Sequence, residues 1–182
     1  MVLRILNTMG MKKEEFVPLR KGEVRIYACG PTVYDFIHIG NARAFVVADL
    51  VRRYLEYKGY KVFFVSNITD IDDKMIKRSQ EMGISIQQLG EIYSDAYFED
   101  IAALNIKKPD VSPRATQHIP EMIEVIQKLI EKGYAYQVDG DVYFDVLKFK
   151  DYGKLSGNRT EALEMGARVE VNPKKKNPAD FA

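Results

Sequence analysis

The chain has 182 residues, of which 46% are hydrophobic and 29% are charged, and its formal net charge at pH 7 is +1. These values fit a globular protein of one domain, or of one domain with a small appendage. They give no overall electrostatic argument for nucleic-acid binding, so any RNA contact must come from a local patch or from parts of a longer protein. The single cysteine excludes an internal disulfide. With neither a membrane-length apolar run nor a signal-peptide pattern, we expect a soluble, cytoplasmic protein without a membrane partner.

The first part of the chain predicts short extended elements. Apolar residues gather at 3–6 and again at 16–19, which predicts two short strands or extended pieces. The β-favouring run at 23–29 predicts a third strand, which ends at the turn dipeptide Gly30-Pro31.

A strand–helix–strand unit follows. The spacing of apolar residues over 39–57 predicts a helix with one buried face that Gly59 ends. Residues 61–66 form a short apolar run of β-formers, which is typical of a buried parallel strand. Together with the strand at 23–29, these elements predict a right-handed βαβ unit and an α/β fold.

The remaining elements divide at a break in the helical pattern. Lys107 to Pro113 interrupts that pattern with two prolines and is the predicted boundary between two lobes. The residues after Lys148 read as loops, with a short helix and a strand near 168–171. The other predicted elements are helices at 72–82 and 85–104, a helix from 119 to Gly133, and a hairpin of residues 134–136 and 142–144 around Asp139-Gly140.

Chemistry-bearing residues follow the first strand of the βαβ unit. The segment His38-Ile39-Gly40-Asn41 stands where the turn meets the predicted helix. A helix start offers backbone N–H groups and a positive dipole end, which together suit a phosphate. Gly40 would allow a ligand to approach the backbone closely, and the imidazole of His38 could donate a hydrogen bond to developing charge. The alternative is that His38 only satisfies the helix start.

A second polar segment, Asn67 to Asp73, follows the second strand. Ligands in open α/β sheets bind outside the carboxyl ends of the strands, so both segments are predicted to lie at one binding edge. Thr69 or Asp70 is expected to cap the helix at 72–82. Cys29 reads either as an inert, buried thiol or as a metal ligand, and one cysteine with two histidines does not make a zinc site alone.

These segments carry a family resemblance. The sequences CGPTVYDFIHIGNAR and NITDIDDK resemble the two signature blocks of the cysteinyl-tRNA synthetases, which are class I aminoacyl-tRNA synthetases. The match runs from Asn7-Thr8 to residues 177–181. It implies that residues 1–112 are the first half of a Rossmann-like, parallel-sheet catalytic domain. Residues 113–182 would be a small α+β connective insertion, truncated before the second catalytic half.

The resemblance also implies an activity: ATP-dependent activation of cysteine to cysteinyl-adenylate, and transfer to tRNA(Cys) in the complete protein, a monomer with Mg-ATP as substrate. Asn41 stands where the class usually has a second histidine. A soft Zn²⁺ ion would select the substrate thiol over a hydroxyl. The implied roles are catalysis for His38 and Asn41, ATP binding for Gly30, His38, Gly40 and Asn41, contact with the substrate cysteine for Gly30 and Thr69, and zinc ligation for Cys29, with the other zinc ligands absent from this chain.

Some features depart from a complete synthetase. Lys74 to Ser79 superficially resembles the Lys-Met-Ser-Lys-Ser loop of the class, but it is predicted to lie inside a helix. Without that loop we expect little or no activity from this chain alone. Two alternatives stay open: a related cysteine ligase with a small amine acceptor, and a non-enzymatic nucleotide- or RNA-binding paralogue. Lys174 to Lys176 is either a solvated loop or an RNA phosphate contact.

Overall fold

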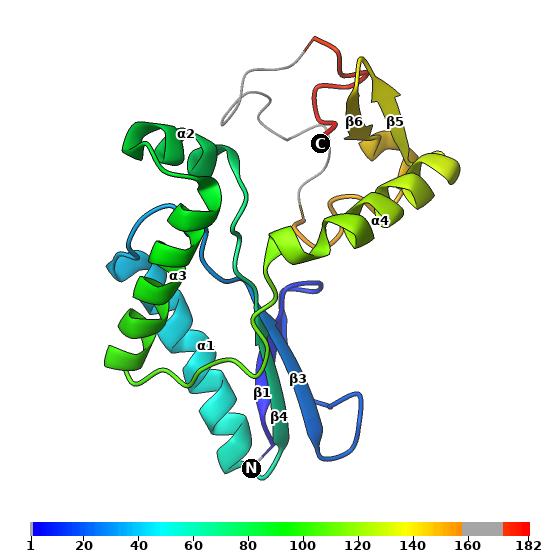
Figure 1. Ribbon diagram of the computed structural model, residues 1–182. Helices are drawn as coiled ribbons and strands as arrows, with labels where there is room; N and C mark the ends of the chain where they lie inside the picture. Colours follow the sequence, from blue (N-terminus) through cyan, green and yellow to red (C-terminus); the bar gives the residue numbers. More distant parts are fainter. Residues whose placement is uncertain (1, 158–172) are drawn as a thin grey trace. The chain divides into compact units, whose positions relative to one another are not determined.

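The computed structural model describes residues 2–157 and 173–182 (Figure 1). The chain forms two compact units. One comprises residues 18–119, and the other comprises residues 1–17 together with residues 120–182. Both signature segments fall within the first of these units.

The unit of residues 18–119 is built on a parallel strand pair. Strands β3 (Glu23–Ala28) and β4 (Lys61–Ser66) pair in parallel, and helix α1 (Ile39–Tyr57) connects them. These bounds confirm the predicted βαβ unit. An extended segment then lies beside β4, through parallel bridges from Val65 to Val111 and from Ile68 to Arg114. The sequence did not predict this pairing, because prolines interrupt the segment.

Two further helices complete this unit. Helix α2 (Asp73–Met82) and helix α3 (Ile86–Ala103) confirm the predicted helices. The ring of Phe45 in α1 meets the ring of Tyr97 in α3 edge-on, with centroids 5.3 Å apart, so these two helices pack side by side (Figure 1). The buried core to which α2 and α3 contribute consists of Val33, Ile68, Met75, Leu89, Tyr93, Tyr97 and Ile101.

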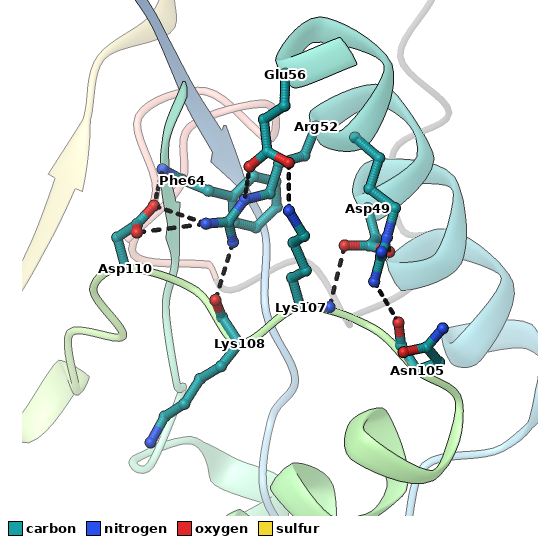
Figure 2. Close-up of polar contacts among 9 residues, drawn as sticks. Asp49, Arg52, Glu56, Phe64, Asn105, Lys107, Lys108 and Asp110 are labelled. Atoms are coloured by element: carbon teal, nitrogen blue, oxygen red, sulfur yellow. Dashed lines mark hydrogen bonds and ion pairs between the residues drawn. The ribbon is translucent and has the colours of Figure 1, made fainter. Parts of the chain in front are cut away.

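A charged network fastens α1 to the segment after α3. The guanidinium group of Arg52, a buried residue, pairs with Glu56 and Asp110, each at 3.2 Å, and donates to the carbonyl of Lys108 at 2.9 Å (Figure 2). Asp110 also accepts from the backbone N–H of Phe64 in β4 at 2.7 Å. Helix α1, strand β4 and the segment after α3 are therefore joined at one point.

The other unit contains two antiparallel hairpins and a helix. Strands β1 (Arg4–Asn7) and β2 (Lys12–Glu15) pair with each other, as do β5 (Ala135–Val138) and β6 (Asp141–Phe144). Helix α4 spans Ile119–Glu131. Its first residue is the last residue of the unit of residues 18–119, and the rest of the helix belongs to this second unit. Short 3-10 helices occur at η1 (Ala115–His118), which belongs to the first unit, and at η2 (Val146–Lys148).

The sequence predicted this second unit unevenly. The β5–β6 hairpin is confirmed, with positive φ angles of 48° at Asp139 and 89° at Gly140. Of the two alternatives for residues 16–19, a strand or an extended piece, the strand is wrong, because the strand is instead the charged segment Lys12–Glu15. An all-polar strand shows no apolar alternation, so its pairing with β1 could not be read from the pattern. The helix and strand predicted near 168–171 lie outside the described residues.

Candidate functional site

The imidazole of His38 caps helix α1. His38 has extended backbone angles, and its Nδ1 atom accepts a hydrogen bond from the backbone N–H of Gly40 at 3.0 Å. The side chain of Asn41 completes a capping box, because its Oδ1 atom accepts from the backbone N–H of His38 at 3.2 Å. The capping role and the motif therefore coincide in the same two side chains.

This cap determines which ring nitrogen of His38 can serve a ligand. A neutral imidazole has one donor nitrogen and one acceptor nitrogen. Because Nδ1 accepts from Gly40, the proton of the neutral ring lies on Nε2. His38 is exposed and can therefore offer an Nε2–H donor to a bound group. The backbone donor of Gly40, in contrast, is already used inside the cap.

The capped helix start borders an open hollow of about 360 Å³. Cys29 and Gly30 from the end of β3, His38, Gly40 and Asn41 from the start of α1, and Lys74 from α2 all line it. Five of the predicted site residues thus share one hollow with a lysine that was not predicted to be there. A volume of several hundred cubic ångströms is the usual size of a small-molecule site.

Hydrogen bonds join the two signature segments. The backbone N–H of Thr69 donates to the carbonyl of Pro31 at 3.0 Å, and the N–H of Val33 donates to the carbonyl of Thr69 at 3.1 Å. The side chain of Asn67 adds a third link, because its Oδ1 atom accepts from the N–H of Gly30 at 2.9 Å. The carboxyl ends of β3 and β4 therefore form one continuous edge, as the sequence predicted.

Gly30 is required by this junction. A Cβ atom at residue 30 would lie 1.7 Å from the carbonyl oxygen of Asn67, well inside van der Waals contact. Only a residue without a side chain can bring the turn after β3 this close to the end of β4. The predicted importance of Gly30 thus has a structural cause that does not depend on any ligand.

The expected cap of helix α2 is wrong. Asp72, and neither Thr69 nor Asp70, caps this helix by accepting from the N–H of Lys74 at 2.8 Å. Asp70 is buried and accepts from the backbone N–H of Thr116 at 2.9 Å and from its hydroxyl at 2.6 Å. It therefore holds the segment beyond α3 against the end of β4, a long-range contact that helix-capping rules cannot predict.

Cys29 is an exposed free thiol at the end of β3. The described residues contain no group of three or more His, Cys, Asp or Glu side chains that could hold a metal ion. A zinc site needs about four ligands. By themselves, these residues do not fit a zinc ion, although the exposed thiol is open to further ligands.

The lysine-rich segment after the second block lies inside α2, as predicted, so it is not a mobile loop. Lys74 nevertheless faces the site, with its ammonium group 5.3 Å from the centre of the Tyr34 ring. Lys74 and Asn67 are the site residues that sequence reasoning missed. Each stands in a quoted signature segment, but its direction depends on the tertiary structure.

The chain also matches a model of a known protein family. Residues 15–182 match the model of the "tRNA synthetases class I (C) catalytic domain". This stretch covers most of the chain, and the chain therefore belongs to that family of ligases. The class I synthetase part of the predicted resemblance is confirmed.

A solved structure supports the fold. Mycobacterium tuberculosis methionyl-tRNA synthetase in complex with methionyl-adenylate is similar, with a TM-score of 0.58 and 21% sequence identity over 63% of this chain. The match confirms the predicted α/β, Rossmann-like fold. This chain spans 23% of the length of that synthetase.

In the described part of the chain, no helix combines the length and the apolar character needed to cross a bilayer.

Proposed function

We propose that this chain contributes the first part of the active site of a cysteine–tRNA ligase. The observation that carries the proposal is the junction of the two signature segments, where His38 and Asn41 lie at the helix start and Asn67 joins Gly30 to Thr69. The family description adds support, since its letter C is the one-letter code of cysteine.

The proposed reaction is attack by a carboxylate oxygen of cysteine on the α-phosphorus of Mg-ATP. A new phosphorus–oxygen bond forms, the bond to the bridging oxygen of the β-phosphate breaks, and pyrophosphate leaves. Such transfers depend on positioning and charge stabilisation and need no covalent protein nucleophile. The Nε2–H of His38 would donate to the phosphate oxygens, and Asn41 would hold the imidazole in place through the capping box.

The amino-acid side of the site would lie at Gly30 and Thr69, with Cys29 beside them. Cys29 would supply one thiolate ligand to a zinc ion, together with ligands that the described residues do not provide. In the complete reaction the cysteinyl group would pass from the adenylate to tRNA(Cys). A monomeric, cytoplasmic protein would suffice for these steps.

Titration of the 182-residue chain with Mg-ATP, with and without zinc, tests the nucleotide side of this proposal. We expect binding that His38→Ala weakens about tenfold, because one hydrogen bond to a charged oxygen is lost. The only other histidine provides a matched control, and His118→Ala should leave the affinity unchanged. Absence of ATP binding, or equal loss in both variants, would contradict the proposal. Cysteine-dependent ATP–pyrophosphate exchange, measured in parallel, shows whether this chain alone also performs the chemistry.

A further inference from the structure

One side-chain amide connects three groups of the amino-acid side. The Oδ1 atom of Asn67 accepts from the backbone N–H of Gly30 at 2.9 Å and from the hydroxyl of Tyr27 at 3.0 Å. Its Nδ2 atom lies 3.1 Å from the Oγ1 atom of Thr69. The orientation of this amide follows from its partners, since a backbone N–H can only donate and the oxygen must therefore face Gly30.

This orientation determines the hydrogen-bond polarity of Thr69. An amide NH₂ group can only donate, so the hydroxyl oxygen of Thr69 accepts from Asn67. This contact does not use the hydroxyl proton, which can therefore be donated to another acceptor. Among residues 2–157 and 173–182, the structure gives this proton no acceptor of its own. Thr69 is partly exposed, so a bound molecule can reach it.

We propose that Asn67 is a positioning residue that presets Thr69 as a hydrogen-bond donor to the bound aminoacyl group. This inference rests on the proposed function, because it assumes that the aminoacyl group binds beside Gly30 and Thr69. Asn67 does not touch the substrate through its amide. It acts through Thr69, and its second contact holds the N–H of Gly30, so that both elements of the subsite keep a fixed separation.

The chain offers a substitution that reverses the polarity and keeps the shape. In Asn67→Asp the carboxylate still accepts from Gly30 and Tyr27, but it cannot donate to Thr69. The Thr69 hydroxyl must then donate to residue 67, and its proton is no longer available to a ligand. Tyr27→Phe is the matched control, because it removes a hydrogen bond to the same Oδ1 atom without touching Thr69.

The hydrogen bond itself is tested without a ligand. In the NMR spectrum of the free chain, Thr69→Val should shift the side-chain amide protons of Asn67 toward the values of an unbonded amide. Val47→Ala, a substitution of an exposed side chain of α1 in the same unit, should leave these signals in place. If Thr69→Val does not move the signals, the proposed contact and the positioning role are both wrong.

The consequence for binding is tested with 5′-O-[N-(cysteinyl)sulfamoyl]adenosine, a stable mimic of the adenylate, and with AMP. We expect Asn67→Asp and Thr69→Val each to weaken binding of the mimic about tenfold, and the double variant to be no weaker than either alone. Binding of AMP should change less than about twofold in all of them, and Tyr27→Phe should bind both molecules normally.

The outcomes separate the two claims. Asn67→Asp binding the mimic as tightly as the unaltered chain, or losses that add in the double variant, would overturn the positioning role while the proposed function stands. If the unaltered chain binds AMP but gains nothing from the cysteinyl group, the proposed amino-acid subsite fails and the role of Asn67 fails with it. If it binds neither molecule, the proposed function fails as a whole.

Discussion

The imidazole of His38 lies directly against the backbone of Gly40. Its Nδ1 atom accepts from the Gly40 N–H at 3.0 Å, and a Cβ atom at residue 40 would lie 2.8 Å from the ring carbon Cε1. Gly40 is therefore required to make space for the His38 ring, whether or not a ligand is bound. The backbone at the helix start therefore fixes the position of the imidazole, and the Nε2–H group of the ring remains available as a donor to a ligand.

Gly40→Ala should displace the His38 ring and weaken Mg-ATP binding about tenfold, because the Nε2–H donor would lose its position. The free energy of unfolding should change by less than about 1 kcal/mol, since alanine favours the helix while the cap is weakened. Titration calorimetry and urea unfolding on the same variant measure the two quantities.

The matched control is Gly90→Ala in α3, where the nearest atom to an added Cβ lies 3.5 Å away, an ordinary contact. It should leave ATP affinity unchanged. Normal ATP affinity in Gly40→Ala would show that the position of the His38 ring does not matter for the nucleotide.

Gly30→Ala should damage the fold itself. The added Cβ would overlap the carbonyl oxygen of Asn67 at 1.7 Å, and the backbone of two strand ends would have to separate. We expect a loss of at least about 3 kcal/mol in the free energy of unfolding, the upper range for an overpacked site. Gly10→Ala, whose nearest neighbour lies at 3.8 Å, is the control in urea unfolding. A Gly30→Ala chain as stable as the control would contradict the close junction.

Arg52→Met tests the charged network that joins α1, β4 and the segment after α3. The substitution keeps the apolar stem but leaves Asp110 and the carbonyl of Lys108 without their guanidinium partner. Breaking a largely buried pair in this way should cost about 3 kcal/mol in the free energy of unfolding. Arg20→Met removes an exposed pair with Glu23 in the same unit and should cost about 1 kcal/mol or less. Equal losses in the two variants would mean that burial of Arg52 does not increase the contribution of its ion pairs to the free energy of unfolding.

Glu56 should make the first unit sensitive to acid. The hydrogen bond from Lys107, aided by Arg52, lowers the pKa of Glu56 below its ordinary value of 4.5. A lowered pKa in the folded state stabilises the protein above pH 4.5, and this contribution is lost as the pH falls through the lowered value. Thermal unfolding between pH 7 and pH 3 should therefore show a smaller loss of stability in Glu56→Gln than in the unaltered chain. Identical pH profiles would contradict this prediction.

Local patterns predicted most of the fold of the first unit. The apolar face of residues 39–57 and the β-forming run at 61–66 are contiguous signals, and glycines mark the helix ends. Patterns failed where a distant partner decides the structure. Lys12–Glu15 is a strand only because β1 pairs with it, and Asp70 binds Thr116 where the sequence offered a helix cap.

The sequence predicted which residues form the site better than it predicted the hydrogen bonds between them. Signature segments identified Gly30, His38 and Gly40 as neighbours at the strand ends, and the structure brings them into one hollow. The role of Asn67 was not visible, because it depends on the orientation of one amide between two strand ends. The direction of the Lys74 side chain likewise follows from the packing of α2.

We propose above that this chain holds the cysteine-activating side of a class I synthetase site. The most direct test compares binding of the cysteinyl and methionyl forms of the sulfamoyl-adenosine mimic to the 182-residue chain, since the similar solved synthetase holds methionyl-adenylate. We expect the cysteinyl form to bind at least about tenfold tighter than the methionyl form or AMP, and Thr69→Val to lose the gain over AMP. Equal binding of the two aminoacyl forms, or tighter binding of the methionyl form, would contradict it.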